Sequence, residues 1–470
     1  MPVGVVHLRH ARGCLPRAAL AVVFLASAAA VAAQPAVPPV PPVPAVPRLE
    51  ERPPGREAPP IENPTGAVSL RDALALALLH NPALAAYAWE ARALEARILP
   101  AGRFPNPTLD LMTEDVGAGR IPGSDSDQPV QPQTTLQLSQ VIELGGKRTA
   151  RQRVAARERD LAAWDYEMAR IDVLSDVSRA FTRVLVAQDT VTLAETAIRI
   201  VTQGQQSVAA RVEAGVVSPI EETRANVAVA GARAEAARAR RALDASRTRL
   251  ALTWGSPTAA FSSAAGDLKV EPPSLPPVGV LTAMLEANPD LARWVAELAQ
   301  REAALALERS KRVVDVAVSA GYRRYTTVDS NAFVVGASIP LPFFNRNVGG
   351  IEEARLRLAK SHEERRVVEA RVAAALTEAY AALAAAHDEI AILRAAILPG
   401  AQQTFDAISE GYRLGRFSLL DVLDAQRTLT SAGSQHLRAL SDYHDAVVQV
   451  ERLIGAPLPG SPSPSSSPRE

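Results

Sequence analysis

The chain has 470 residues, of which 47% are hydrophobic and only 4% aromatic, with 51 basic and 51 acidic side chains. Its apolar character comes mainly from alanine and leucine, which favours close packing of helices over packing of sheets. The balanced charge excludes a global field that would attract nucleic acid. Arginine clusters at 147–159 and 233–249 lie in helical patterns, so we interpret both as solvated helix faces.

The first 33 residues carry the pattern of a secretory signal peptide. Three arginines precede an apolar run at 18–33, which ends in small residues. The single cysteine, Cys14, lies before that run, so the exported chain is expected to lack a disulfide, a thiolate metal site and a lipid-modified first residue. Twelve of the 36 prolines fall in residues 34–66 and Ser-Pro repeats fill residues 458–470, which predicts an extended leader and a flexible tail.

The first half, residues 67–257, is predicted to combine long helices with two strands. Apolar residues at helical spacing begin after Ser69, an N-cap candidate, and Asn81-Pro82 interrupts them. Apolar and polar residues then alternate over about 108–116 and 133–144. The elements expected after these strands are a proline-free helix at 147–211 and a return helix at 218–254.

A linker at 258–277 leads to a second half, residues 278–457, with the same order of elements. Asn288-Pro289 interrupts its first helical pattern. Its strands are expected at about 313–322 and 332–341, and every predicted strand has the length that crosses a bilayer when tilted. The elements that follow are a helix at 349–413, which Pro399 should kink without ending, and a return helix at 418–454.

The two halves also match residue by residue at their sharpest turns. Gly215 and Ser218 lie 200 positions before Gly415 and Ser418. A glycine followed by a serine between two helical patterns predicts a helix stop and a helix N-cap. We therefore interpret the chain as a tandem duplication in which two long helical hairpins turn at these residues.

Four strands of bilayer length pose an edge problem. They cannot close a membrane barrel by themselves, because such barrels need at least about eight strands. The open edges must therefore be paired by oligomerisation. A dimer would supply eight strands and a trimer twelve, and the internal repeat would give a trimer approximate sixfold symmetry.

The order of elements, together with several short motifs, resembles the TolC family of outer-membrane efflux ducts, and most of all its CzcC-like heavy-metal branch. The resemblance covers about residues 68–457, and its specificity lies in the ordered recurrence of the elements. The motifs that carry it are Asn81-Pro82, Pro105-Asn106-Pro107, Glu143-Leu144-Gly145-Gly146-Lys147-Arg148, Leu414-Gly415 and Asp421-Val422-Leu423-Asp424-Ala425.

The resemblance implies a mainly α fold with a membrane β-barrel portion. Three chains with four strands each would form a 12-stranded barrel among the lipids of the outer membrane, continuous with a long periplasmic α-helical barrel. This homotrimer would be the exit duct of a tripartite efflux system, docked through a periplasmic adaptor onto an inner-membrane pump of the RND type. It would conduct heavy-metal cations such as cobalt, zinc or cadmium, without a cofactor and without contact to nucleic acid.

The resemblance also assigns roles to residues near the second hairpin tip. Asp421 and Asp424 match paired acids that line the closed end of the duct, where a trimer would hold two rings of carboxylates that attract cations. Plain helix capping is the alternative, since Asp421 is the third residue after Ser418. Tyr412 matches a latch tyrosine and Glu221 its acidic partner, so a hydrogen bond between these two is expected in the closed state.

The chain departs from the family pattern in two places. Phe417 replaces a basic residue found near the tip in the best-known member. Arg224 is the repeat equivalent of Asp424, and an Arg224–Asp424 pair would replace the missing charge. The hairpin tips expected to meet the adaptor carry Gly215, Ser218, Gly415 and Ser418.

Other functions have little support in the sequence. Gly145-Gly146-Lys147 lacks the upstream glycine and the following Ser or Thr of a phosphate loop, and the histidines have no metal-site spacing, so we predict neither an enzyme nor a metal site. A duct for drug or type I protein export is an alternative, since such ducts are similar. A remoter alternative is an exported coiled-coil scaffold or adaptor, which would not need four strands of bilayer length.

Overall fold

The computed structural model describes residues 42–48, 63–116, 132–268, 273–326 and 330–459. The chain divides into two compact units, Met1–Pro39 and Val40–Glu470, and all described residues belong to the second unit. The expected signal peptide lies outside the described residues. So do most of the expected proline-rich leader and all but the first two residues of the expected tail.

The first half begins with a short strand and two helices that meet at a break. Ser69 caps the first helix through a capping box with Asp72, which confirms it as an N-cap. Asn81 causes the break, since its side chain accepts from the Leu84 amide (3.0 Å) and donates to the Thr253 carbonyl (2.8 Å). The elements are β1 (Gly66–Ser69), α1 (Leu70–His80), α2 (Pro82–Ala101), β2 (Thr108–Glu114), β3 (Gln133–Ile142), α3 (Lys147–Glu213), α4 (Pro219–Leu252) and β4 (Phe261–Ala265).

The second half repeats this arrangement at its own Asn-Pro break. The Asn288 side chain accepts from the Leu291 amide (3.0 Å) and donates to the Leu453 carbonyl (2.6 Å). In both halves, therefore, an asparagine ties the helix break to the end of the return helix. The elements are α5 (Val278–Met284), a 3-10 turn η1 (Leu285–Ala287), α6 (Pro289–Ser310), β5 (Val316–Tyr325), β6 (Ser330–Ser338), α7 (Val348–Ile392), a π-helical turn η2 (Leu393–Ile397), α8 (Leu398–Arg413) and α9 (Leu419–Ile454).

All four expected strands are present. β2 and β3 begin where predicted and end two residues early, which leaves β2 with seven residues, and β5 and β6 differ from the prediction by two or three residues at each end. β5 begins three residues later than expected because Asp315 is engaged outside the ladder. Its carboxylate accepts from the Leu144 amide (3.0 Å) and pairs with Lys147 (2.7 Å). β6 ends three residues early, since Pro340 has no amide hydrogen to donate to a ladder.

The long helices follow the predicted pattern. α3 is unbroken from Lys147 to Glu213, slightly longer than the expected 147–211. The second long helix is divided, because the π-helical turn η2 separates α7 from α8 immediately before Pro399. A proline removes a backbone donor and crowds the preceding turn, which accounts for the local widening of the helix. The structure therefore confirms that Pro399 disturbs this helix without ending it.

One antiparallel sheet contains the four long strands in the order β2-β3-β5-β6. Its two faces differ in chemistry. One face is polar: the Arg323 guanidinium lies 3.2 Å from the Glu114 carboxylate and donates to the Thr135 hydroxyl (2.9 Å). The opposite face is apolar, and one of its rows runs through the register partners Leu109, Leu138, Ala320 and Val335.

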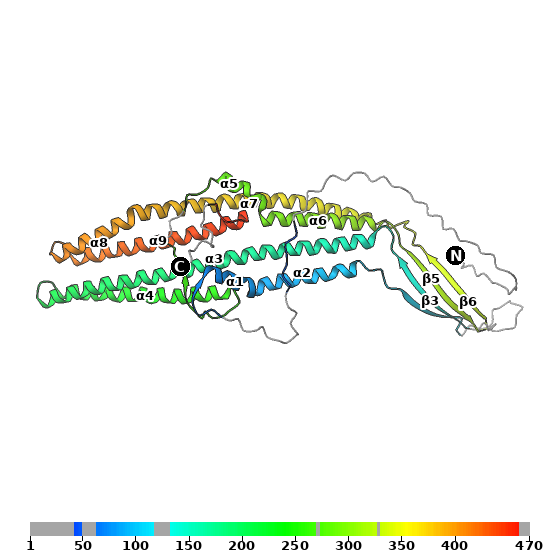
Figure 1. The fold of residues 1–470 in the computed structure, drawn as a ribbon, viewed down its shortest axis with the longest axis horizontal. Coiled ribbons are helices and arrows are strands. Elements are labelled where there is room, and N and C mark those ends of the chain that lie inside the picture. Colours follow the sequence, from blue (N-terminus) through cyan, green and yellow to red (C-terminus); the bar gives the residue numbers. More distant parts are fainter. Residues whose placement is uncertain (1–41, 49–62, 117–131, 269–272, 327–329, 460–470) are drawn as a thin grey trace, which may run out of the picture. The chain divides into compact units, whose positions relative to one another are not determined.

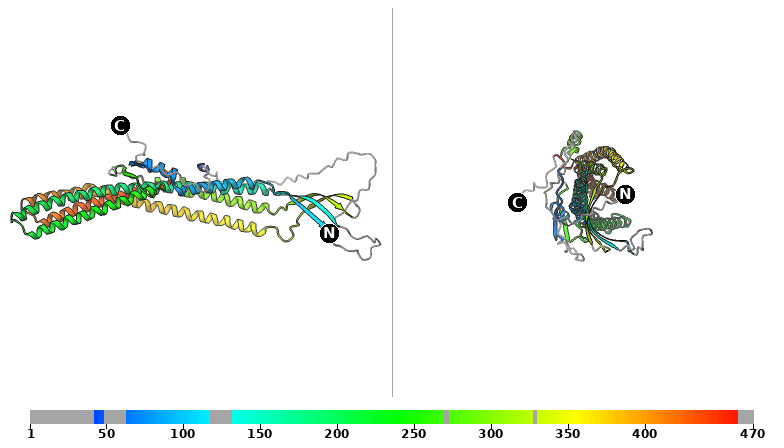
Figure 2. Two further views of the ribbon diagram at one scale, coloured as in Figure 1. Left: turned by 90° about the horizontal axis from the view of Figure 1, so that it is seen from below. Right: turned by 90° about the vertical axis from the view of Figure 1, so that its right-hand side faces the viewer.

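Among the described helices, α3 has a central position, since it packs against α2, α4, α6 and α9. α7 packs against α6 and α9, and α8 packs against α9 (Figures 1 and 2). The helical hairpins α3–α4 and α8–α9 turn at the ends that lie away from the sheet (Figure 1). None of the described helices combines the length and the hydropathy that a membrane-spanning helix needs.

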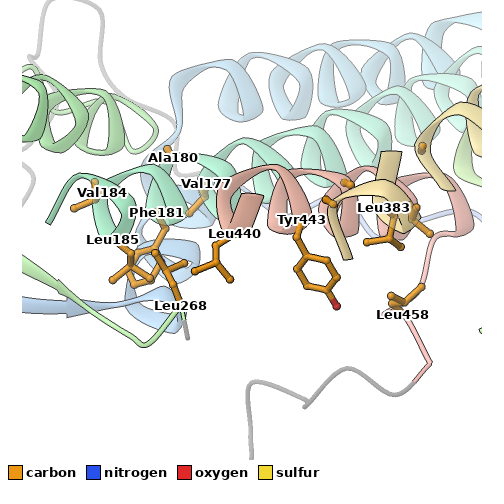
Figure 3. Packing of buried hydrophobic residues seen from close by; sticks show 14 of the residues in the cluster. Val177, Ala180, Phe181, Val184, Leu185, Leu268, Leu383, Leu440, Tyr443 and Leu458 are labelled. Atoms are coloured by element: carbon orange, nitrogen blue, oxygen red, sulfur yellow. The ribbon is translucent and has the colours of Figure 1, made fainter. Parts of the chain in front are cut away.

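The largest core lies near the middle of α3, where β1 and β4 form a small parallel sheet. Phe181 of α3 and Leu440 and Tyr443 of α9 pack together there, and Leu383 of α7 belongs to the same cluster (Figure 3). The Gln188 side chain donates to the Ala264 carbonyl (3.1 Å) and accepts from the Ala264 amide (2.7 Å), which fixes β4 to α3. The expected linker at 258–277 thus contains a strand that helps to build the core.

Candidate functional site

Both helical hairpins end in the same hydrogen-bonded turn. Gly215 and Gly415 have φ values of +70° and +77°, a left-handed conformation that glycine adopts without steric cost. The amide after each glycine donates to the carbonyl five residues earlier, at 2.9 Å in the first tip and 2.8 Å in the second. This pattern ends a helix by satisfying its last carbonyls. Both glycines are therefore confirmed as helix stops at the hairpin tips.

The serines that follow begin the return helices, but only the second forms a capping box. The Ser418 hydroxyl accepts from the Asp421 amide (3.3 Å), and the Asp421 carboxylate accepts from the Ser418 amide (2.8 Å) and hydroxyl (2.7 Å). These hydrogen bonds favour the charged carboxylate, so they hold the pKa of Asp421 below its usual value. Ser218 accepts only from the Ile220 amide (3.4 Å). Asp421 is thus a capping residue of α9.

Asp424 lies one turn further along α9 in a different situation. Its side chain is exposed and has no hydrogen bond or ion pair within the part of the chain that the structure describes. Arg224, on α4, is exposed as well, and the expected Arg224–Asp424 pair is not formed within the chain. The two acids that the sequence pairs are therefore distinct, since Asp421 is engaged in a cap and the carboxylate of Asp424 is available.

Tyr412 belongs to a small apolar cluster that joins the two tips. It is 6% exposed and packs with Val208 of α3, Ala225 of α4 and Leu419 of α9. Its hydroxyl is buried and has no hydrogen-bond partner among the described residues. The hydrogen bond expected between Tyr412 and Glu221 is therefore not formed within the chain, because packing encloses the hydroxyl in this cluster.

Arg211 is a tip residue without a predicted role in the sequence. Its guanidinium carbon lies 4.8 Å from the centre of the Tyr412 ring, and its Nη1 donates to the Tyr412 carbonyl (3.2 Å). Burial raises the pKa of Tyr412; the Arg211 charge opposes this shift and the nearby Glu221 charge adds to it. The sequence marks Arg211 only by a break in the repeat, since its equivalent in the second half is Gly411.

A groove of about 1090 Å³ lies behind the tips and is lined by α3, α4 and α9. Many of its lining side chains are small or carry hydroxyl groups. Three arginines on its wall, Arg224, Arg427 and Arg438, are exposed and have no ion pair among the described residues. Within the same part of the chain, no three His, Cys, Asp or Glu side chains gather in a way that could hold a metal ion.

Comparison with known proteins places this geometry in a family. The sequence profile of the outer membrane efflux proteins matches residues 73–256 and again residues 280–456. The cobalt-zinc-cadmium resistance protein CzcC of Cupriavidus metallidurans is 35% identical over 390 residues, which are 83% of this chain and 90% of that protein. The nickel-cobalt-cadmium resistance protein NccC of Alcaligenes xylosoxydans xylosoxydans is 28% identical over 318 residues, 68% of this chain and 70% of that protein.

A solved structure has the same fold. The crystal structure of CusC superimposes with a TM-score of 0.70 at 18% identity and covers 83% of this chain and 94% of that chain. These findings confirm the resemblance drawn from the sequence, together with the expected combination of long helices and a four-stranded sheet in each chain. The chain belongs to the outer membrane efflux protein family, non-enzymatic channels of the outer membrane that have a periplasmic helical extension and act in tripartite efflux systems.

Proposed function

We propose that this outer-membrane channel is the exit duct for divalent heavy-metal cations, and that it works as a homotrimer with a periplasmic adaptor and an RND-type inner-membrane pump. The substrate class rests on one observation: a cobalt-zinc-cadmium resistance protein is 35% identical over 83% of this chain. The second relative, a nickel-cobalt-cadmium resistance protein, is named for cations of the same charge. The duct conducts the cation passively while the pump selects it.

The trimer is supported by the open edges of the four-stranded sheet. β2 and β6 each have a neighbour on one side only, so the other side of each strand has unpaired amide and carbonyl groups. Such groups are costly in a lipid bilayer, which is why membrane sheets close into barrels. In the trimer, β6 of each chain pairs with β2 of the next, and the barrel closes with twelve strands, four from each chain.

The two faces of the sheet support the same assembly. The apolar face, with Leu109, Leu138 and Val335, lies toward lipid, because apolar side chains are stable there. The polar face, with Arg323 and Glu114, lines the lumen. Polar side chains thus predominate on the inward face and apolar ones on the outward face, the distribution of water-filled membrane barrels.

The hairpin tips are the proposed contact with the adaptor. Gly215, Ser218, Gly415 and Ser418 are all exposed at the ends of the two hairpins. The groove beside them, at about 1090 Å³, has small residues that admit a helix and unpaired arginines that favour acidic side chains on that helix. A helical hairpin of the adaptor is therefore the occupant that we propose for this groove.

The charged constriction is assigned mainly to Asp424. Its carboxylate is exposed and free, and three copies would form a ring of negative charge that attracts divalent cations. Asp421 would form a neighbouring ring, although its carboxylate already serves as the cap of α9. Tyr412, Glu221 and Arg224 form the proposed closed-state latch. When the tips of neighbouring chains close together, the cluster around Tyr412 repacks and its buried, unpartnered hydroxyl gains a hydrogen-bond partner.

The decisive experiment uses cells that lack their own channel. The chain is expressed with the pump and adaptor of a zinc efflux system, and separately with the pump and adaptor of a drug efflux system. We expect tolerance to zinc, cobalt and cadmium to return in the first strain, without a gain of drug tolerance in the second. Drug tolerance without metal tolerance would establish the alternative drug duct. No gain in either strain, with trimers present in the outer membrane, would refute the proposal.

A further inference from the structure

The proline-rich leader repeats one short pattern at constant spacing. Val37, Val40, Val43 and Val46 are three residues apart, and a proline follows each of them. A polyproline II helix has three residues per turn, so this spacing places all four valines along one edge of such a helix. The leader thus presents the same apolar side chain, followed by the same ring, once in every turn.

Local chemistry favours the polyproline II conformation over residues 42–48, which we call the leader segment. Three of its residues are prolines, which fix φ at about −65°. Val43 and Val46 each precede a proline, and a residue in that position is restricted to extended backbone. In the structure the leader segment is neither helix nor strand, as expected of polyproline II. Much of its backbone is therefore ordered in advance, so binding it costs little entropy.

The leader segment lies across α2 and α3, where Val46 is half-buried (Figure 1). Val46 packs against Leu84 and Ala88 of α2 and Tyr166 of α3, each of which is at most 5% exposed. We call these three residues the valine socket. Val43, one polyproline II turn earlier, is 37% exposed and is not part of this cluster. The socket therefore has room for one valine of the leader at a time.

Arg92 adds a polar contact beside the valine socket. Its Nη2 donates to the Val46 carbonyl (2.8 Å), and its Nη1 pairs with the Glu95 carboxylate (2.5 Å) one turn along α2. A polyproline II helix has no internal hydrogen bonds, so each of its carbonyls is free to accept. A charged donor makes such a bond roughly twice as strong as a neutral one does. The site thus recognises a valine side chain together with the carbonyl of the same residue.

The second half of the chain holds a proline-rich segment by a comparable contact. Within residues 273–277, the Pro276 carbonyl accepts from the Tyr380 hydroxyl of α7 (3.1 Å). The residue that corresponds to Arg92, at the same distance from the Asn-Pro break, is Ala299, which has no side-chain donor. A helical side chain thus binds a proline-rich carbonyl in both halves, but the arginine beside the valine socket is specific to the first.

The other valines of the leader offer the groups that Val46 offers. The site contacts one valine side chain and one carbonyl, and Val37, Val40 and Val43 supply the same two groups before a proline. Binding an earlier valine lengthens the connection to β1 by three residues for each repeat. The entropy cost of a loop grows only slowly with its length, so the earlier valines are close competitors of Val46.

We propose that the valine socket and Arg92 form a binding site for Val-Pro repeats in the polyproline II conformation, and that the chain's own leader occupies it at any one of four successive valines. A step from one valine to the next moves the leader by about 9 Å along its axis, since polyproline II rises about 3.1 Å per residue. The leader is thus a tether whose free length changes in steps of three residues. This role is independent of the substrate that the duct conducts.

The test measures where the leader lies along α2. The exported chain is expected to contain no cysteine, so Arg48→Cys and Glu90→Cys provide two exposed sites for nitroxide labels, one on the leader segment and one on α2. A second series uses Ala83→Cys, about 10 Å away along the same helix, so that the direction of a movement is also determined. The full exported chain is labelled, diluted with unlabelled chain and measured by pulsed electron spin resonance, which gives the distances between labels of one chain.

In Val46→Asp we expect Val43 to enter the socket, so the two series should show residue 48 displaced by about 9 Å along the leader, with distances as well defined as before. Unchanged distances would show that Val46 does not hold the leader. A broad distribution, in this variant or in the labelled chain without it, would show that the valines are not interchangeable occupants of the site. Either result overturns the proposal.

The arginine is tested in the same way. Arg92→Ala should broaden the distances, because the bond to the leader carbonyl is lost. Arg97→Ala is the matched control and should leave them unchanged, since Arg97 lies on the same helix and its guanidinium is 3.6 Å from the Glu158 carboxylate of α3. The same distances in both variants would show that the arginine does not hold the leader, and would refute the site as proposed.

Discussion

The guanidinium of Arg211 covers the ring of Tyr412 at 4.8 Å and donates to the Tyr412 carbonyl at 3.2 Å, so one side chain of the first hairpin holds the end of the second. Arg211 lies in the last turn of α3 and Tyr412 in the last turn of α8. Because this contact and the apolar cluster around Tyr412 join the two tips of a chain, we expect the tips to move together. Opening of the duct therefore has to act on, or around, this joint.

Replacing Arg211 should loosen the joint. Arg211→Ala removes a cation–π contact and a charge-assisted hydrogen bond, together worth about 2 kcal/mol, or about 30-fold in an opening equilibrium. We expect a higher open probability of the purified protein in planar bilayers. Arg199→Ala is the matched control, because Arg199 lies exposed on the same helix and, among the described residues, donates only to the Thr196 hydroxyl one turn away. Equal open probabilities for the two variants would show that the joint does not restrain the tips.

The proposed latch makes a different prediction. Within the chain the Tyr412 hydroxyl has no partner, so its removal should not weaken the folded chain and can affect gating only through a contact between chains. We expect Tyr412→Phe combined with Arg224→Ser to raise single-channel conductance. Tyr443→Phe is the control, since Tyr443 is buried in the core near the middle of α3. An unchanged conductance of the double variant would eliminate the latch.

Ion selectivity should separate the two aspartates. Asp424→Asn removes an exposed, unpaired charge from each chain, so cation selectivity and block by divalent cations should fall. Asp421→Asn should alter selectivity much less, because the carboxylate of Asp421 is engaged by the Ser418 cap. Reversal potentials under cation gradients measure both effects. The opposite order, with Asp421 controlling selectivity, would contradict the assignment of the constriction to Asp424.

Acid should weaken the second tip before the first. The pKa of Asp421 is lower in the folded tip than in the unfolded chain, where it is about 3.9. The cap therefore stabilises the tip fully above the unfolded pKa, and this stabilisation is lost as pH falls through the lower folded pKa. Hydrogen exchange of the first-turn amides of α9 should therefore speed up, relative to intrinsic rates, below about pH 4. The first tip has no capping box and serves as the internal control.

Substitution of the cap checks this interpretation. Asp421→Asn leaves a side chain that does not titrate, so the acid-dependent increase in exchange should vanish from α9. If the increase persists in Asp421→Asn, the acid response of the tip has another source and the cap does not control it.

Local rules predict much of this structure from the sequence. The Asn-Pro breaks, the left-handed glycines of both tips and the Ser418 cap depend on residues within one or two turns of each other, so short-range patterns suffice. The strand hairpins are also predictable, because alternation over about ten residues is a distinctive pattern. Their ends are not, because an ion pair such as Asp315–Lys147 takes residues out of the ladder.

Long-range contacts mark the limit of prediction. The Arg211–Tyr412 contact joins residues 201 positions apart. The 200-residue repeat pairs Arg211 with Gly411, and this break in the repeat marks Arg211 as unusual without identifying Tyr412 as its partner. The β1–β4 pair is similar, because strands of four and five residues are too short for a clear alternation. The sequence likewise offers Glu221 as the partner of Tyr412, whereas the hydroxyl is buried in the structure and forms no hydrogen bond with a described residue.

Gly411 and Phe417 form a pair that the tandem repeat also obscures. A β-carbon on Gly411 would lie 2.7 Å from Cε2 of Phe417, so the bare backbone of α8 is what allows the ring to pack across the tip. Gly411→Ala should displace the ring and destabilise the tip by about 1–3 kcal/mol, although alanine is the better helix former. Adding Phe417→Ala should recover most of this loss, because the clash then disappears.

Hydrogen exchange of the α9 first turn measures the effect, and Gly231→Ala is the matched control. Gly231 is also helical, but no heavy atom lies within 4 Å of the β-carbon it would gain, so that change should stabilise α4 by about 0.5–1 kcal/mol. The two glycine substitutions should therefore have opposite signs. If Gly411→Ala protects α9 from hydrogen exchange as much as Gly231→Ala protects α4, Phe417 moves freely out of the way of the new methyl group. The conformation of the tip would then depend on the Ser418 cap and the Arg211 contact alone.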